Sequence, residues 1–579
     1  MSPKSLRVLL LTACGLLGLV VFRSWTNTHE LEFVPFSEEQ RIKGDGIPWD
    51  MIRPQKQLVW QNCAPGRHCA RLIVPLNHSE PEGEQATIAL ARFPSSLAQN
   101  SKLYRGPILV NPGGPGGSGV DMVLGGGGNL LSTIVGPQFD IVGFDSRGIA
   151  RSTPRVSFFK TDVERSFWDL GLNVVNNSAE GVARTWAQAQ ITGKLAAESD
   201  NGYLKHINTD QTARDMLSIV EAHGRSKLQY WGFSYGTVLG ATFASIFPDK
   251  IERMVIDGVA DTEDYYSNRW STSLIDTDKV LTDFFAGCAN AGPDDCEFWA
   301  PTADDIRQNL TRLYNAVRSK PLPVKLASSY GLLDYAKLRI TILRSLYSPY
   351  ALFPLLSRGL AALAAGDGSL LFSQFATPPF ECSCDPLAHA SDSVDDASIA
   401  IVCNDGDEVP GDLEDAEKHL EMMTKVSSWG EIWSSVRIQC SGWPKLPKQG
   451  FRGPFMAKTS HPILLIGNTA DPVTPLWSAK NVSRGFEGSV VLQQNSSGHC
   501  SVSAPSVCTQ QHVRRYFVDG TLPAAGTVCD TIGKPFPDAK SLEMGDQQAV
   551  LTSNMTPDER DIYKAVLELS EKPIIKFTL

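Results

Sequence analysis

Short apolar runs alternate with helix-like periods along the first half of the chain. Uninterrupted apolar stretches at 107–111, 139–144, 228–233 and 253–256 predict strands, and apolar spacing at 209–223 and 237–247 predicts helices between them. Strands without polar interruptions are typical of a parallel sheet that helices cover on both faces. The pattern therefore predicts an α/β fold with a mostly parallel sheet.

A different pattern precedes these strands. Strand-like segments at 58–61, 70–75 and 86–92 are separated by turn residues around 77 and 80–83. Close spacing of strands with short polar turns is typical of antiparallel pairing. We expect an antiparallel lead-in to the main sheet.

The alternation of strands and helices stops near Asp261 and resumes with a strand at 462–466. Roughly 200 residues lie between, far too many for a plain loop. Helical spacing recurs there at 276–286, 306–317, 336–345 and 351–364. We interpret 261–445 as an inserted, mainly helical cap between two parts of one core, 26–260 and 446–540. The second core part holds a last strand at 489–493, and 541–579 is predicted to be a polar tail with one helix at 557–570.

The N-terminus carries the one long apolar run of the chain, residues 8–22. Lys4 and Arg7 precede this run and Arg23 follows it. Its length suits the apolar part of a signal peptide and is short for a membrane span, but no clear small-residue cleavage site follows. Residues 1–25 are therefore interpreted as either a signal peptide or an uncleaved signal anchor, and both place the protein in the secretory pathway.

The 12 cysteines agree with that compartment. In a secretory protein, closely spaced cysteines in loop-like sequence indicate disulfides. The expected bridges are Cys63–Cys69, Cys288–Cys296, Cys508–Cys529 and, on weaker grounds, Cys403–Cys440. Eleven cysteines lie outside the leader, so at least one stays free. Six N-x-Ser/Thr sequons support a secreted glycoprotein, at Asn77, Asn176, Asn309, Asn481, Asn495 and Asn554.

Composition removes several classes of function. Lys plus Arg number 53 against 63 Asp plus Glu, which leaves no basic surplus for a nucleic-acid backbone. A single apolar run excludes a multi-pass membrane protein. Cys and His at metal-ligand spacing are not found, so no metal or organic cofactor is expected.

Candidate chemistry begins with the segment Gly232-Phe-Ser234-Tyr-Gly236. It directly follows a predicted strand and directly precedes a predicted helix. This strand–turn–helix context is the one in which a serine serves as a nucleophile, because the sharp turn requires small residues two positions before and after it. Ser234 is therefore the candidate nucleophile.

A serine nucleophile also needs an oxyanion hole. The glycine-rich segment 111–119 follows an earlier strand, and glycines let backbone N–H groups approach a substrate without side-chain obstruction. Gly114 is the first choice of donor and Gly113 the second, with the N–H of Tyr235 as the partner donor. The segment lacks the Gly-Lys-Ser/Thr ending of a phosphate-binding loop.

An acid and a base should follow the serine in that chain order. Asp471 comes five residues after the strand at 462–466, and His499 follows the strand at 489–493. Carboxyl ends of parallel strands meet at one edge of a sheet, where such folds build their sites. We expect His499 to take the proton of Ser234 and Asp471 to orient His499.

These motifs together resemble a known group of enzymes. The turn 113–116, the segment 144–148 with Ser152, and the elbow at Ser234 are similar to the prolyl aminopeptidase branch of the α/β-hydrolases. The segments 498–500, 516–520 and 526–529 resemble the C-terminal region of tripeptidyl aminopeptidases, called TAP-like. The resemblance implies an α/β-hydrolase fold and exopeptidases acting on a free N-terminus. The chain departs from it at Ala150, which stands in a glycine position, and Asp145 and Arg147 are expected to tie loops together.

The predicted function is that of a serine hydrolase working by acyl transfer. The favoured substrate is a peptide with a free amine; the alternative is an ester or amide of a small natural product. A cap carboxylate facing Ser234 would favour the first, and a wholly apolar pocket the second. Candidate carboxylates are Glu381 and the acidic stretch 405–408, for which a solvated loop is the competing interpretation. A non-enzymatic binding module would be a third class, which the presence of all three candidate residues disfavours.

Overall fold

The computed structural model describes residues 47, 49–171, 175, 178–327, 329–374, 394–448, 450–536, 552–553 and 555–571. The chain divides into two compact units, Met1–Pro48 and Trp49–Leu579, and the second contains nearly everything described. The predicted leader, Cys14, Cys382, Cys384, Glu381 and the sequons at Asn176 and Asn554 lie outside the described residues. None of the described helices is long and apolar enough to cross a membrane.

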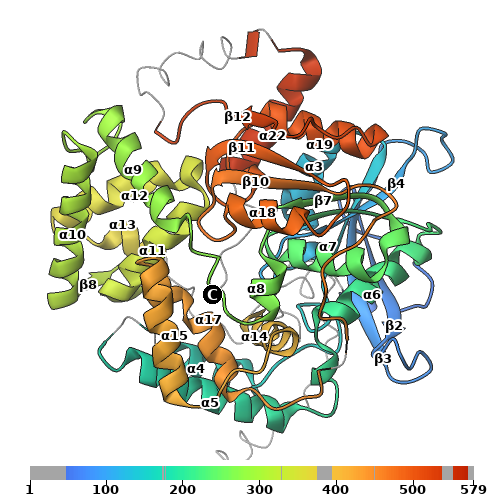
Figure 1. Cartoon of the computed structure of the whole chain (residues 1–579), viewed down its shortest axis with the longest axis horizontal. Coiled ribbons are helices and arrows are strands. Elements are labelled where there is room, and N and C mark those ends of the chain that lie inside the picture. The colour runs from blue at the N-terminus through green and yellow to red at the C-terminus, as the bar shows by residue number, and fades with distance from the viewer. Residues whose placement is uncertain are drawn as a thin grey trace, which may run out of the picture. The chain divides into compact units, whose positions relative to one another are not determined.

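One ten-stranded sheet forms the centre of the second unit (Figure 1). Its strand order is β1-β2-β3-β5-β4-β6-β7-β10-β11-β12. The first three strands and the β3–β5 pair are antiparallel, and all pairs from β5 to β12 are parallel. The bounds are β1 Gln61–Ala64, β2 Arg67–Pro75, β3 Gln85–Phe93, β4 Gly106–Asn111, β5 Phe139–Phe144, β6 Leu228–Phe233, β7 Ile251–Asp257, β10 Leu464–Ala470, β11 Val490–Ser497 and β12 Val528–Asp530. The α/β class and the antiparallel lead-in are thereby confirmed.

Helices cover both faces because the central strands are apolar on both sides; every residue of β4, β5 and β6 is buried. The helices of the first core part are α2 Gly119–Met122, α3 Gly128–Val135, α4 Asp162–Leu170, α5 Gly181–Ser199, α6 Thr209–Ala222 and α7 Tyr235–Ile246. Helix α8, Thr262–Tyr266, begins the inserted segment. Those of the last part are α18 Leu476–Ser483, α19 Val507–Asp519 and α22 Pro557–Glu571. Short turns are η2 Trp49–Met51, η3 Val123–Gly127, η4 Leu204–His206, η5 Pro248–Lys250, η6 Gln439–Gly442 and η7 Ser501–Ser503.

The inserted segment is mainly helical, as predicted. Its further elements are α9 Thr277–Ala291, α10 Ala303–Ser319, β8 Leu322–Lys325, β9 Tyr330–Leu333, α11 Tyr335–Tyr347, α12 Pro349–Ala364, α13 Ser369–Ser373, α14 Val394–Asp405, α15 Leu413–Val426, α16 Gly430–Trp433 and α17 Ser435–Ile438. Helices α9 to α13 gather beside β10 and β11 (Figure 1). They share a second hydrophobic core, built around residues such as Phe284, Phe353 and Trp429. Helix α14 instead contributes Ala397, Ala400 and Ile401 to the main core.

Several element predictions need correction. The strand expected at 58–61 begins only at Gln61. The helix expected at 209–223 is α6, Thr209–Ala222, and it is capped by Asn208, whose side chain accepts from Gln211 N–H. The strand at 489–493 is not the last, because β12 pairs with β11 beyond it. Helix α22 of the predicted polar tail buries residues such as Ile562 and Val566 and packs on α3. Its inward face is apolar although its composition is polar.

Four disulfides join the predicted pairs, Cys63–Cys69, Cys288–Cys296, Cys403–Cys440 and Cys508–Cys529. Cys500 is free and buried. Disulfides persist in oxidising compartments, so these four indicate an extracellular or secreted protein.

Candidate active site

Ser234 occupies the sharp turn between β6 and α7. Its backbone has a φ of 56° and a ψ of −124°, a conformation that non-glycine residues rarely adopt. The turn is held by Ser234 N–H, which donates to the carbonyl of Asp257, and by Thr237, whose N–H and hydroxyl donate to the carbonyl of Ser234. Strained backbone of this kind clusters at functional sites, where the surrounding structure holds the residue in place.

The glycines that flank the serine are required by close approach of neighbouring atoms. A Cβ on Gly232 would lie 2.4 Å from Tyr230 Cε1 and 2.5 Å from the carbonyl oxygen of Gly236. A Cβ on Gly236 would lie 2.9 Å from the carbonyl oxygen of Asn111. Real Cβ atoms do not approach heavy atoms so closely, so the sequence must place glycine on both sides of the turn.

The glycine-rich loop after β4 lies directly against this turn. A Cβ on Gly113 would come within 2.5 Å of the carbonyl oxygen of Phe233 and 2.8 Å of Ser234 Cβ. The N–H of Gly113 donates to the side chain of Asn111 at 2.9 Å, which occupies it. Gly114, with a φ of 112°, lines the same cavity as Ser234 and Tyr235. The geometry thus favours Gly114 over Gly113 as an N–H donor toward a ligand.

His499 and Asp471 form a buried pair at the ends of β11 and β10. Both carboxylate oxygens of Asp471 lie 3.0 Å from His499 Nδ1. The carboxylate also accepts N–H bonds from Val473, Thr474 and Cys500. Because these backbone donors orient the carboxylate, they also fix the plane of the imidazole that it contacts.

Further contacts reach this pair from its own loop and from the cap. Thr474 Oγ1 lies 3.2 Å from His499 Nδ1. His499 N–H donates to the carbonyl of Tyr347 at the end of α11, and the two rings pack edge to face at 4.8 Å. The cap therefore takes part in placing His499.

A single cavity connects these groups. Its volume is about 510 Å³, part of which is open to solvent. It is lined by Gly114, Ser234, Tyr235, Val238, Ala260, Tyr265, Trp270, Ser273, Tyr347, Trp433, Val473, Thr474 and His499. Aromatic rings from the cap, including its first helix α8, dominate the wall, and no Asp, Glu, Lys or Arg is among these residues. Two of the three predicted residues, Ser234 and His499, thus line one largely aromatic pocket without Asp, Glu, Lys or Arg. The third, Asp471, lies behind the pocket against His499.

Two buried groups lie beneath this pocket. The carboxylate of Asp257, at the end of β7, accepts from Ser501 N–H and Ser501 Oγ, and burial raises its pKa to about 6 against the lowering effect of these bonds. Cys500 Sγ donates to the carbonyl of Asp257, and burial raises the pKa of its thiol. A thiol kept protonated is a poor nucleophile, so Cys500 acts as packing here.

The segment after β5 ties loops together as expected. Asp145 accepts from Ser118 Oγ and from the N–H groups of Val120 and Arg151. Arg147 is fully buried and forms a bidentate pair with Asp215 on α6. Ala150, close to these residues in the chain, adopts a φ of 44°.

The acidic stretch 405–408 is neither a solvated loop throughout nor a set of carboxylates that line the pocket. Asp405 is buried, accepts from Thr209 and Tyr265, and has its pKa raised to about 6 by burial. Asp407 and Glu408 are exposed and pair with Arg452 and Lys445. No residue of this stretch is part of the pocket lining.

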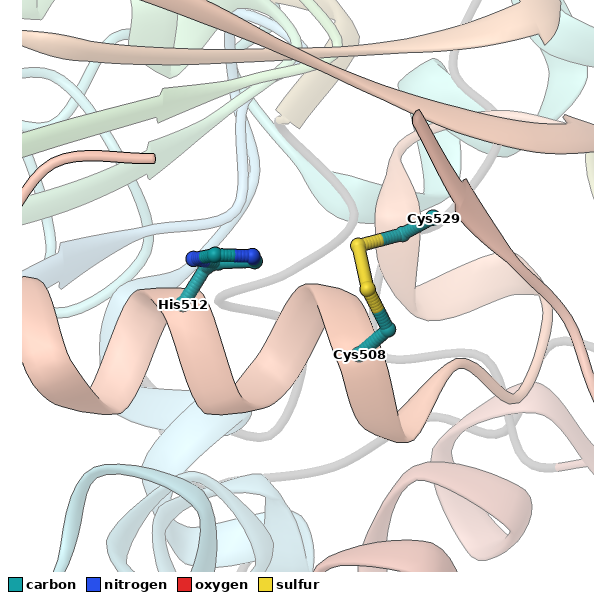
Figure 2. A group of neighbouring side chains, drawn as sticks. All are labelled: Cys508, His512 and Cys529. Carbon is teal, nitrogen blue, oxygen red and sulfur yellow. A yellow bond between two sulfur atoms is a disulfide. The ribbon is translucent and has the colours of Figure 1, made fainter. Parts of the chain in front are cut away.

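One group of described residues has the composition of a metal site. Cys508, His512 and Cys529 place one potential ligand atom each within 4.8 Å of one another. Figure 2 shows, however, that the sulfurs of Cys508 on α19 and Cys529 on β12 are bonded to each other while His512 lies one turn along the helix. Disulfide sulfurs are not thiolate ligands, so this group supports no metal site.

Sequence reasoning missed seven residues of the pocket lining, among them Tyr347, Trp433 and Thr474. Tyr347 and Trp433 come from the cap and Thr474 from the loop after β10. The aromatic residues Trp270 and Tyr265 also line the pocket, whereas Tyr266 and Trp443 pack on Phe455 and Phe158. No local motif marks Tyr347 or Trp433, because only the folded cap carries them to Ser234.

Known proteins resemble this chain over most of its length. The family described as alpha/beta hydrolase fold matches residues 106–333, and the family described as TAP-like protein matches residues 424–529. Serine protease Hip1 of Mycobacterium tuberculosis is 28% identical over 500 residues, which cover 84% of this chain and 91% of the relative. Tripeptidyl aminopeptidase of Streptomyces lividans is 26% identical over 508 residues, covering 83% and 87%. Carboxylesterase B of M. tuberculosis is 29% identical over 475 residues, covering 80% and 86%.

Solved structures give a weaker likeness. An alpha/beta hydrolase from a deep-sea metagenome library has a TM-score of 0.32 and 12% identity, covering 77% of this chain and 98% of that one. This distant likeness adds nothing to the assignment, which rests on the two family matches and on relatives named as serine protease and tripeptidyl aminopeptidase. The chain is a serine hydrolase with the α/β-hydrolase fold, and its C-terminal part matches the TAP-like family.

Proposed function

We propose that Ser234, His499 and Asp471 form the catalytic triad of an acyl-transfer reaction. The observation that carries this proposal is that His499 is bound to Asp471 on one side and shares a cavity with the strained Ser234 on the other. Ser234 Oγ attacks the substrate carbonyl while His499 Nε2 takes its proton. Asp471 holds Nδ1–H and stabilises the imidazolium.

The oxyanion of the tetrahedral intermediate binds backbone N–H groups of Gly114 and Tyr235. Both residues line the cavity beside Ser234, and Tyr235 is the first residue of α7, where helix N–H groups lack partners within the helix. His499 then returns the proton to the leaving group, and water hydrolyses the acyl-enzyme by the same route in reverse.

We propose an aminopeptidase that releases short peptides or single residues from a free N-terminus. Relatives named serine protease and tripeptidyl aminopeptidase support peptide substrates. A specific observation favours a second candidate, an esterase or amide hydrolase for small molecules: the described lining contains no carboxylate that could bind a substrate ammonium group. A relative named carboxylesterase points the same way.

Labelling with a fluorophosphonate tests the mechanism. We expect covalent labelling of the purified protein and its loss in Ser234→Ala, because the probe reacts with an activated serine. An unlabelled, folded wild-type protein would refute the triad. Peptidyl amides in matched free-amine and N-acetylated forms, beside simple esters, separate the two substrate classes: turnover only of free amines supports an aminopeptidase, and turnover only of esters supports the second candidate.

We also propose that the protein is secreted through the leader 1–25. Four disulfides and the sequons support this location. The mass of the protein purified after secretion from its natural host would show whether the leader is removed. The change in mass after glycosidase treatment would show whether glycans are attached.

A further inference from the structure

The carboxylate of Asp405 connects the cap to the nucleophile turn. Asp405 ends α14, a helix of the inserted segment, and is buried in the main body of the protein. Its Oδ1 accepts the N–H of Thr209 at 2.8 Å, and its Oδ2 accepts the Thr209 hydroxyl at 2.5 Å. Thr209 is the first residue of α6, so the negative charge lies at the end of the helix where it is favoured.

The hydroxyl of Thr209 is also hydrogen-bonded to the hydroxyl of Tyr235. The two hydroxyl oxygens are 2.5 Å apart. Thr209 has one hydroxyl proton, and an ionised Asp405 can only accept, so that proton goes to the carboxylate. Thr209 Oγ1 must then accept the proton of the Tyr235 hydroxyl. The chain of donation therefore runs from Tyr235 through Thr209 to Asp405.

Asp405 also accepts a hydrogen bond directly from a residue of the pocket wall, Tyr265. The hydroxyl of Tyr265 donates to Asp405 Oδ2 at 2.9 Å. The rings of Tyr235 and Tyr265 have centroids 5.8 Å apart, and that of Tyr265 packs edge to face with Trp270 at 5.3 Å. Tyr235, Tyr265 and Trp270 all line the cavity. One carboxylate thus restrains two walls of the pocket from behind.

The loop that carries Asp405 is itself fixed. The disulfide Cys403–Cys440 closes next to it, and Lys448 Nζ donates to the carbonyls of Cys403 and Gly406. Arg452 Nε donates to the carbonyl of Asp405. A rigid mount of this kind lets a side chain define the position of its partners.

We propose that Asp405 is a positioning residue of the reaction, which sets the nucleophile turn through Thr209 and Tyr235 and the pocket wall through Tyr265. This inference rests on the proposed function, in which Tyr235 N–H is an oxyanion donor. Asp405 does not touch the substrate. Its effect arises because Tyr235 follows Ser234 directly, so a shift of the Tyr235 side chain tilts the N–H that faces the oxyanion.

The test compares four variants by their reaction with a small alkyl fluorophosphonate. Thr209→Val removes the linking hydroxyl and keeps the side-chain shape and the backbone N–H; Thr209→Ser keeps the hydroxyl. Asp405→Asn puts an amide donor where the carboxylate must accept. Glu408→Gln, three residues away and paired with the exposed Lys445, is the matched control. The rate of phosphonylation at saturation and the half-saturating concentration are measured well below each variant's melting temperature.

We expect Thr209→Val and Asp405→Asn to lower the saturated rate roughly 10- to 100-fold, with the half-saturating concentration changed less than threefold. Thr209→Ser and Glu408→Gln should stay within threefold of wild type. Rates within threefold for folded Thr209→Val, or equal losses in Thr209→Ser and Thr209→Val, would overturn the proposal even if Asp405→Asn fails to fold. Failure of the proposed function would appear separately, as wild-type labelling that persists in Ser234→Ala or does not occur at all.

Discussion

Replacing Asp471 by Asn tests whether this carboxylate sets the tautomer of His499, as proposed. The carboxylate has two acceptor sides: Oδ1 takes the N–H groups of Val473 and Thr474, and Oδ2 takes that of Cys500. Both oxygens are 3.0 Å from His499 Nδ1. An asparagine has one oxygen for these sides, and we expect it to face the two N–H groups because that orientation leaves fewer donors unpaired.

The amide nitrogen then takes the place of Oδ2 beside His499 Nδ1 and can only donate to it, while the remaining oxygen already accepts the N–H groups of Val473 and Thr474. His499 is driven to the tautomer with its proton on Nε2, and this nitrogen can no longer accept the proton of Ser234. A loss of about 10⁴ in kcat is expected, which corresponds to about 5.5 kcal/mol of activation free energy. The N–H of Cys500 loses its acceptor, which should lower the free energy of unfolding by about 1–3 kcal/mol.

Steady-state kinetics on the best substrate and urea unfolding measure the two effects. Asp264→Asn is the matched control, because Asp264 is also buried and accepts from Ser271 and Thr272 but is not bonded to His499. It should lose stability and keep kcat within about threefold. A folded Asp471→Asn protein with more than a tenth of the wild-type kcat would refute the assignment of Asp471 as the orienting acid.

Three further predictions concern the turn, one strained residue and pH. In Gly232→Ala the added Cβ has no room beside Tyr230 and Gly236, so fluorophosphonate labelling should slow at least about 100-fold; unchanged labelling would contradict the steric argument. Ala150→Gly should raise the free energy of urea unfolding by up to about 1 kcal/mol, because glycine tolerates the φ of 44°, and a decrease would count against it. Burial raises the pKa of Asp257 from its ordinary value near 4 to about 6. The stability that this shift contributes is therefore fully present only below about pH 4, and it is lost as the pH rises through 6. The unfolding free energy of wild type minus that of Asp257→Asn should accordingly fall by about 2 kcal/mol between pH 4 and pH 6.5, and a flat difference would contradict the raised pKa.

The parts of this fold that could be predicted are those encoded locally. Uninterrupted apolar runs located β4, β5 and β6, and the spacing of small residues around Ser234 identified the turn, because a Cβ at Gly232 or Gly236 is sterically excluded. Asp471 and His499 followed from their place after strands of the same sheet. The strand β12 was missed because its three residues carry too little pattern to stand out from a loop.

The parts that could not be predicted depend on contacts between distant segments. The side chain of Asn111 accepts the N–H of Gly113, and this contact, which favours Gly114 as the donor, cannot be read from the sequence. Tyr347 and Trp433 reach the pocket only after the cap has folded. Asp405 looked like one acid among several, and its separate role depends on Thr209, nearly 200 residues earlier in the chain.

The loops that bear Asp471 and His499 are built into the cap as much as into the sheet. Val473 belongs to the hydrophobic core of the cap, Thr277 on α9 donates to the carbonyl of Pro472, and Tyr347 accepts the N–H of His499. The cap, which we expect to select the substrate, and the pair that we propose to move the proton are therefore packed directly against each other. A cap exchanged for that of a relative, to change what the enzyme accepts, would also change how fast it reacts, so selectivity and turnover in this protein cannot be engineered independently.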